Sequence, residues 1–158
     1  MTTAVVQKLR PPVMGSDEEF VKSKAMEELG MMLCARHGLA AGQYQIAYLW
    51  KRKGGKSKGK PKLGQAQLTN TGLLSYFADY EAVIWLAADN LAEYDSGQIE
   101  AVLYHELLHI GSDEETLDIK LVPHDFEGFV SELSVYGAYD HDLMQMRDAV
   151  FTQAELGL

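Results

Sequence analysis

Apolar residues between positions 21 and 33 recur every three or four residues, a spacing that predicts an amphipathic helix. Ser16–Glu19 precedes them and has the form of a capping box, in which a hydroxyl and a carboxylate satisfy backbone donors at a helix start. Gly38 follows His37 and is a typical C-terminal stop. We therefore expect the first helix to begin near Ser16 and to end near Gly38.

Further along the chain the hydrophobic period becomes that of a strand. Residues 44–50 alternate in the period-2 pattern of β-forming side chains, and Leu63–Leu68 is a weaker segment of the same kind. Lys51–Pro61 lies between them and is so rich in lysine and glycine that it predicts a long hairpin loop. Val83–Ala88 is apolar at every position, which predicts a third strand buried on both faces.

The remainder of the chain has mainly helical patterns. Asp95 and Ser96 are both suitable N-caps for a helix over residues 97–110. Two further helices are predicted over residues 125–136 and 142–155. One helix, three strands and then three helices are typical of an α+β fold, here a small mixed or antiparallel three-stranded sheet packed against helices.

The length of the chain, 158 residues, is about that of one domain. We therefore expect a single domain over residues 1–158, with an extended N-terminal stretch over residues 1–15. No apolar run is long enough to cross a bilayer, and no signal-peptide pattern follows Met1. These features predict a cytoplasmic protein without membrane contact, and they leave the oligomeric state open.

The net charge of −9 combines two halves of opposite sign. Residues 1–78 hold 12 basic and 5 acidic residues, a net charge of +7, whereas residues 79–158 hold 2 and 18, a net charge of −16. Half of all the basic residues fall in the loop over residues 51–62, namely Lys51, Arg52, Lys53, Lys56, Lys58, Lys60 and Lys62. Cys34 is the only cysteine, so a metal would have to be held by nitrogen and oxygen.

His105, Glu106 and His109 form an HExxH motif within the helix predicted over residues 97–110. On a helix the two histidines are about 40° apart, and Glu106 is about 60° from His109 on the same side. One cation can therefore contact both imidazoles. Apolar residues occupy the opposite side of the helix, which we expect to anchor it in the core while the histidines face a cleft.

A catalytic zinc ion typically takes three protein ligands and leaves one position for water, so a further ligand is required. His124 lies 15 residues beyond His109 and is the preferred third ligand. Glu127 and Glu132 in the next predicted helix are alternatives, because a carboxylate from a second helix is the other common solution. Both carboxylates and Asp125 are also candidates to orient ligand imidazoles through their second nitrogen.

Two imidazoles and a third nitrogen or oxygen ligand favour one Zn²⁺ per chain. Zinc lowers the pKa of water to about 7, which suits Glu106 as the general base that later protonates the leaving amine. Tyr136 and Tyr139 are candidate donors to the oxyanion. The predicted reaction is the hydrolysis of a peptide or amide bond.

These motifs lie within a longer resemblance. Between about Gln43 and Tyr136 the chain resembles the putative phage metallopeptidase family, a zincin-like group related to SprT-type proteases. The matching segments are Ile46–Trp50, Gly59–Ala66, Ile84–Asn90, His105–His109 and His124–Glu127. The resemblance implies zinc ligation by His105, His109 and His124, with Glu106 as the general base.

The resemblance also implies where a substrate lies. It makes the strand before the HExxH helix, Val83–Ala88, the edge along which an extended peptide or protein substrate adds as a further strand. If the protein is encoded by a phage or prophage, the expected cytoplasm is that of the host cell.

A different class of function is suggested by the basic residues between positions 51 and 62. Seven cations on one loop would release counterions from phosphate and bind nucleic acid without sequence preference. In this alternative the chain is a module that binds nucleic acid or a host protein, and its metal is structural or vestigial. No aromatic side chains alternate with the lysines as a stacking platform for bases.

Overall fold

The computed structural model describes residues 8–69, 79–123 and 135–136. The chain divides into two compact units, Met1–Val122 and Pro123–Leu158, and nearly all of the described residues belong to the first. Most of the helix predicted over residues 125–136, and all of the one over 142–155, lie outside the described residues. The expected single domain stays a prediction.

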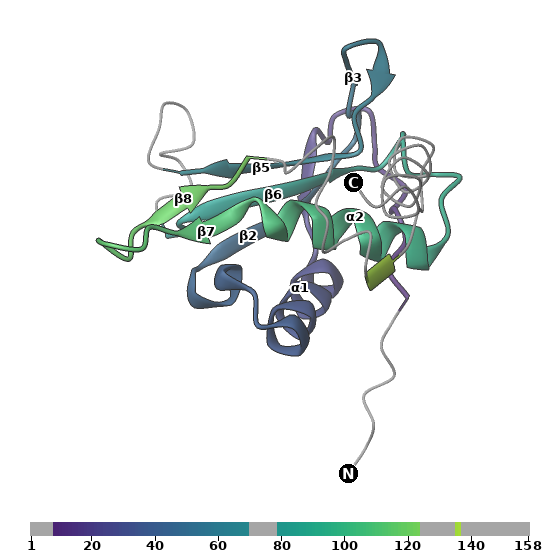
Figure 1. Cartoon of the computed structure of the whole chain (residues 1–158). Helices are drawn as coiled ribbons and strands as arrows, with labels where there is room; N and C mark the ends of the chain where they lie inside the picture. Colours follow the sequence, from purple (N-terminus) through teal and green to yellow (C-terminus); the bar gives the residue numbers. More distant parts are fainter. Residues whose placement is uncertain (1–7, 70–78, 124–134, 137–158) are drawn as a thin grey trace, which may run out of the picture. The chain divides into compact units, whose positions relative to one another are not determined.

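A four-stranded mixed sheet forms the centre of the first unit (Figure 1). In spatial order its strands are β1 (Phe20–Lys22), β2 (Ile46–Lys51), β6 (Ala82–Ala87) and β5 (Gly64–Leu68). β2 and β6 are parallel, whereas β1 and β5 run antiparallel to their neighbours. The predicted α+β class is confirmed. The predicted three-stranded sheet is wrong, because residues expected in the first helix form β1 instead.

β6 is an interior strand of this sheet. Each of its residues is buried, as its continuous apolar sequence predicts, and Ile84 is paired with Tyr48 on one side and with Ala66 on the other. The expectation that Val83–Ala88 forms a sheet edge is therefore wrong. Within the described residues the two edge strands are β1 and β5.

The basic segment between β2 and β5 has regular structure of its own. β3 (Lys56–Ser57) and β4 (Lys60–Pro61) pair as a small antiparallel hairpin. The segment does not join two neighbouring strands of one hairpin, because β6 lies between β2 and β5.

α1 (Lys24–His37) begins later than predicted. Its N-cap is Ser23, whose hydroxyl oxygen accepts a hydrogen bond from the Met26 N–H at 3.1 Å. Ser16–Glu19 is a turn and bend before β1, so its capping-box pattern does not start a helix. Gly38 ends the helix as predicted, in the left-handed conformation with a φ of 62°.

α2 (Ser96–Leu108) matches the predicted second helix within two residues at each end. Asp95 is its N-cap and exchanges two hydrogen bonds with Gln98, at 2.8 and 3.0 Å, which makes a capping box. The largest fully buried side chains come mainly from the two helices and β6: Met26, Leu33, Ile84, Leu86, Leu91, Ile99, Leu103 and Leu107. In the described part of the chain no helix is long and apolar enough to span a membrane.

Both helices pack on the same face of the sheet (Figure 1). Gly30 of α1 faces Tyr48 of β2 so closely that a Cβ there would lie 2.5 Å from the tyrosine ring. α2 lies over β5 and β6 and leads, through His109, into a hairpin of β7 (Ile110–Ser112) and β8 (Ile119–Leu121). β8 lies beside β5, so this hairpin adjoins the edge of the sheet.

Candidate metal centre

His105 and His109 lie one helical turn apart at the C-terminal end of α2, where His109 is the C-cap. Their ring centroids are 5.0 Å apart, the ring planes are inclined at 74°, and both residues are half-buried. Two imidazoles bound to one tetrahedral zinc at about 2.0–2.1 Å have ring centroids roughly 5 Å apart. The spacing of the pair therefore suits a shared metal ion.

The imidazole of His109 is oriented by the β7–β8 hairpin. Its Nδ1 atom lies 2.7 Å from the carbonyl oxygen of Val122, and the main chains of the two residues are joined by a 2.6 Å hydrogen bond from the Val122 N–H. A carbonyl oxygen only accepts, so Nδ1 carries the proton. The lone pair is then on Nε2, which is free to bind a metal while the other ring nitrogen donates to a carbonyl, as is common in metal-binding histidines.

Glu106 lies between the histidines in sequence and is only 6% exposed. A Cβ at Gly64, the first residue of β5, would lie 3.3 Å from the Glu106 Cγ, 2.8 Å from Leu86 Cδ2 and 2.9 Å from the Trp85 carbonyl oxygen. The glutamate stem therefore packs against the start of the edge strand. Glycine at position 64 leaves the space for this approach.

The turn of the β7–β8 hairpin is held by side chains on either side. Tyr44 follows the short helix η1 (Ala40–Gln43), and its hydroxyl is hydrogen-bonded to the Ser112 hydroxyl. The Asp113 carboxylate accepts hydrogen bonds from the backbone N–H groups of Glu115 and Thr116, at 2.9 and 3.0 Å. The bond from Thr116, and then that from Glu115, lowers the pKa of Asp113.

Two of the expected ligands, His105 and His109, and the expected base, Glu106, lie within the described residues. They contain no group of three or more His, Cys, Asp or Glu side chains that could hold a metal ion. Tyr136 is half-buried and belongs to the second unit. Five other candidates lie outside the described residues: His124, Asp125, Glu127, Glu132 and Tyr139. The His105–His109 pair fits two positions of a zinc site, and the third ligand stays a prediction.

Three residues that shape this centre were not selected from the sequence as site residues. Val122 acts through its backbone carbonyl, which no side-chain motif reveals. Gly64 and Gly111 act through the absence of a side chain: a Cβ at Gly111 would lie 2.5 Å from Val122 Cγ2. The HExxH motif identifies the side chains but not the backbone that holds them.

Of three comparisons with known proteins, one found a match. Residues 18–151 match the family described as "Putative phage metallopeptidase". No curated protein and no solved structure matches the chain.

Proposed function

Because the chain belongs to the putative phage metallopeptidase family, we propose that it is a zinc-dependent peptidase that hydrolyses peptide bonds in the host cytoplasm. The observation that carries the proposal is the pairing of His109 Nδ1 with the Val122 carbonyl oxygen at 2.7 Å. Together with the 5.0 Å spacing of the His105 and His109 rings, this hydrogen bond supports a metal on the Nε2 side of His109.

The chemistry follows from the residues at the end of α2. When bound, Zn²⁺ supplies a Lewis acid that polarises a carbonyl and acidifies water. Glu106 then acts as the general base and afterwards delivers the proton to the leaving amine. Its contact with Gly64 supports this role, since a carboxylate held against a strand has few alternative positions.

His124 is the third ligand in this proposal. Val122 pairs with His109, and His124 follows Val122 by two residues in the sequence. Glu127 and Glu132 remain the alternatives. Asp125 is a candidate to orient an imidazole, and Tyr136 and Tyr139 are candidate oxyanion donors.

We place the substrate along β5 rather than along β6. Among the described residues no strand is hydrogen-bonded to the outer side of β5, although β8 lies beside it, and Glu106 packs against its first residue, Gly64. An extended peptide that adds to an edge strand gains main-chain hydrogen bonds whatever its side chains are. This position would bring a scissile bond close to Glu106.

The decisive variant is Glu106→Gln, which keeps the shape of the buried side chain and removes the base. We expect the purified variant to bind one zinc per chain, as the wild type does, and to cleave a casein or peptide-library substrate at least about 100-fold more slowly. Glu100→Gln makes the same chemical change earlier on α2 and is the matched control, for which wild-type cleavage is expected. Equal cleavage by wild type and Glu106→Gln would overturn the proposal.

Metal analysis tests the ligands separately. We expect His105→Ala, His109→Ala and His124→Ala each to weaken zinc binding, with folding checked by circular dichroism. If His124→Ala binds zinc as tightly as the wild type does, the assignment of His124 is wrong and Glu127→Gln and Glu132→Gln become the variants to measure. A wild-type protein that takes up no zinc would refute the metal site altogether.

A further inference from the structure

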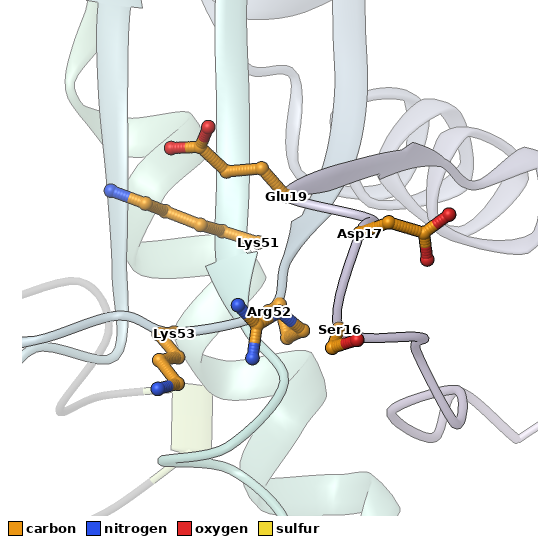
Figure 2. Close-up of a pocket in the computed structure, with 6 residues that line it drawn as sticks. All are labelled: Ser16, Asp17, Glu19, Lys51, Arg52 and Lys53. Carbon is orange, nitrogen blue, oxygen red and sulfur yellow. The ribbon is translucent and has the colours of Figure 1, made fainter.

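The seven basic residues between positions 51 and 62 occupy three different environments. The ammonium groups of Lys51 and Lys62 lie over the ring of Trp85, at 4.7 and 5.5 Å from its centroid. Arg52 is half-buried and lines a pocket of about 340 Å³, whose other lining residues are Lys51, Lys53 and, from the segment before β1, Ser16, Asp17 and Glu19 (Figure 2). The exposed side chains belong to the remaining four: Lys53, Lys56, Lys58 and Lys60.

The tip of the β3–β4 hairpin is a two-residue turn made by Lys58 and Gly59, whose φ angles are 53° and 78°. Positive φ at both positions is the pattern of a type I′ turn, which prefers asparagine, aspartate or glycine. A lysine in the left-handed region costs about 1–2 kcal/mol. The turn geometry alone therefore does not account for lysine at position 58, and such strain is a common mark of a functional position.

The base of the hairpin is clamped to the end of β6. The Asn90 side-chain amide donates hydrogen bonds to the carbonyl oxygens of Gly55 and Lys62, at 3.0 and 2.7 Å, and the Asp89 carboxylate accepts one from the Gly54 N–H at 2.9 Å. A Cβ at Gly54 would lie 2.6 Å from the Lys62 carbonyl oxygen, so the clamp also requires a glycine. The lysines are thus presented on a preformed element.

The exposed lysines surround the hairpin instead of lining one side. Lys56 is opposite Pro61 and Ser57 is opposite Lys60, so Lys56 and Lys60 point to opposite faces and Lys58 is at the tip. The other exposed residues of the hairpin are serine, glycine and proline, and no apolar or aromatic anchor for a protein partner is among them. Cations on both faces of a narrow ribbon match phosphates on both walls of a groove.

We propose that the β3–β4 hairpin enters a groove of double-stranded nucleic acid and binds its phosphates through Lys56, Lys58 and Lys60. A major groove about 12 Å wide admits a two-stranded β-ribbon. Contacts to phosphates position a protein without reading the sequence. The net charge of −9 makes the chain as a whole repel nucleic acid. The attraction to phosphate is therefore confined to residues 51–62, which include seven basic and no acidic residues.

The test is a titration of the full chain against a fluorescent duplex DNA oligonucleotide at several salt concentrations. Three phosphate contacts predict a slope of about −2.7 in a plot of log affinity against log salt. Lys58→Asn suits the turn better, so it should not lower the melting temperature, and it should reduce the slope by about 1. A variant with Lys56, Lys58 and Lys60 all changed to Glu should lose detectable binding.

The matched control changes three exposed cations outside the hairpin, Lys8, Arg10 and Lys24, to Glu, and should keep most of the affinity. Equal losses in the two triple variants, or binding that does not depend on salt, would overturn the proposal. So would tighter binding to the single strand, or equally effective competition by polyglutamate, which would indicate an acidic protein partner. Binding is measured without turnover, so this result is separate from the test of the peptidase.

Discussion

The imidazole of His109 and the backbone carbonyl of Val122 are joined across the β7–β8 hairpin, with 2.7 Å between Nδ1 and the carbonyl oxygen. A candidate ligand at the end of a helix is thereby oriented by a residue 13 positions further along the chain. Any change that separates β7 from β8 should therefore weaken metal binding without altering a ligand. This dependence can be tested because the two strands approach closely at a glycine.

Gly111→Ala should weaken zinc binding and destabilise the fold. The new Cβ would lie 2.5 Å from Val122 Cγ2, so the Val122 side chain or the backbone that carries it must shift, next to the carbonyl that bonds His109. We expect a loss of about 1–3 kcal/mol in the free energy of unfolding and about 10–100-fold in zinc affinity. Denaturant titration measures the free energy of unfolding, and competition with a chromophoric chelator measures the zinc affinity.

The control for this prediction is the double variant Gly111→Ala with Val122→Ala. Removing the valine methyls makes room for the new Cβ and leaves the Val122 carbonyl in place. Zinc affinity should recover most of its loss. If the double variant binds zinc no better than Gly111→Ala alone, the hairpin does not act through this contact.

Gly64→Ala should impair catalysis through the position of Glu106. The added Cβ would meet Leu86 Cδ2 at 2.8 Å and the Trp85 carbonyl oxygen at 2.9 Å, so β5 must shift against β6. It would also lie 3.3 Å from Glu106 Cγ, so the glutamate stem has to move as well. We expect the free energy of unfolding to fall by about 1–3 kcal/mol and kcat/KM to fall by up to about 100-fold, while zinc still binds.

Gly97→Ala is the matched control for this effect, because it adds the same methyl group in the first turn of α2, where only Asp95 Oδ1 lies within 4 Å. It should leave activity unchanged and raise stability by up to about 1 kcal/mol. Normal activity in Gly64→Ala would show that Glu106 does not depend on β5 for its position.

The sequence alone predicts the elements with strong periodicity and clear caps. Residues 96–108 combine an N-cap, an apolar side and the HExxH motif, and all three features indicate the same helix. Ser16–Glu19 shows the limit of such reasoning, because a capping-box pattern is local and the pairing of Phe20–Lys22 with β2 outweighs it. A strand partner distant in sequence leaves no signal in the segment itself.

The same limit applies to the position of β6 in the sheet. Its apolar residues correctly indicate burial on both faces, but burial of faces does not say which strands occupy its edges. β5 is close to β2 in sequence and yet pairs with the far side of β6. Among the residues of the candidate site, the side chains of His105, Glu106 and His109 are selected by the motif alone, whereas the carbonyl of Val122 becomes visible only with the register of the hairpin.

Asn90→Ala should destabilise the base of the β3–β4 hairpin. It removes two hydrogen bonds, to the carbonyl oxygens of Gly55 and Lys62, at a cost of about 1–3 kcal/mol in the free energy of unfolding. Because no charge changes, binding to duplex DNA should weaken while its salt slope stays that of the wild type. Asp89→Asn keeps an oxygen acceptor for the Gly54 N–H and is the control, with near wild-type stability expected. Full stability in Asn90→Ala would contradict the clamp.

The buried thiol of Cys34 should make the protein lose stability at high pH. Burial raises the pKa of its thiol from 9.0 to about 11, so between these values the folded thiol keeps a proton that the unfolded thiol releases. Deprotonation then favours the unfolded chain, and stability should fall as the pH rises from 9 towards 11, by up to about 3 kcal/mol.

Cys34→Ala removes this titration, and comparing the two proteins isolates the thiol from the other groups that titrate at high pH. We expect the free energies of unfolding of variant and wild type to differ by a constant amount below pH 8. Above pH 9 the wild type should lose more stability than the variant does. Denaturant titrations across this range give the difference directly. Parallel curves up to pH 11 would mean that the folded thiol titrates at its ordinary pKa and that Cys34 is not shielded by the core.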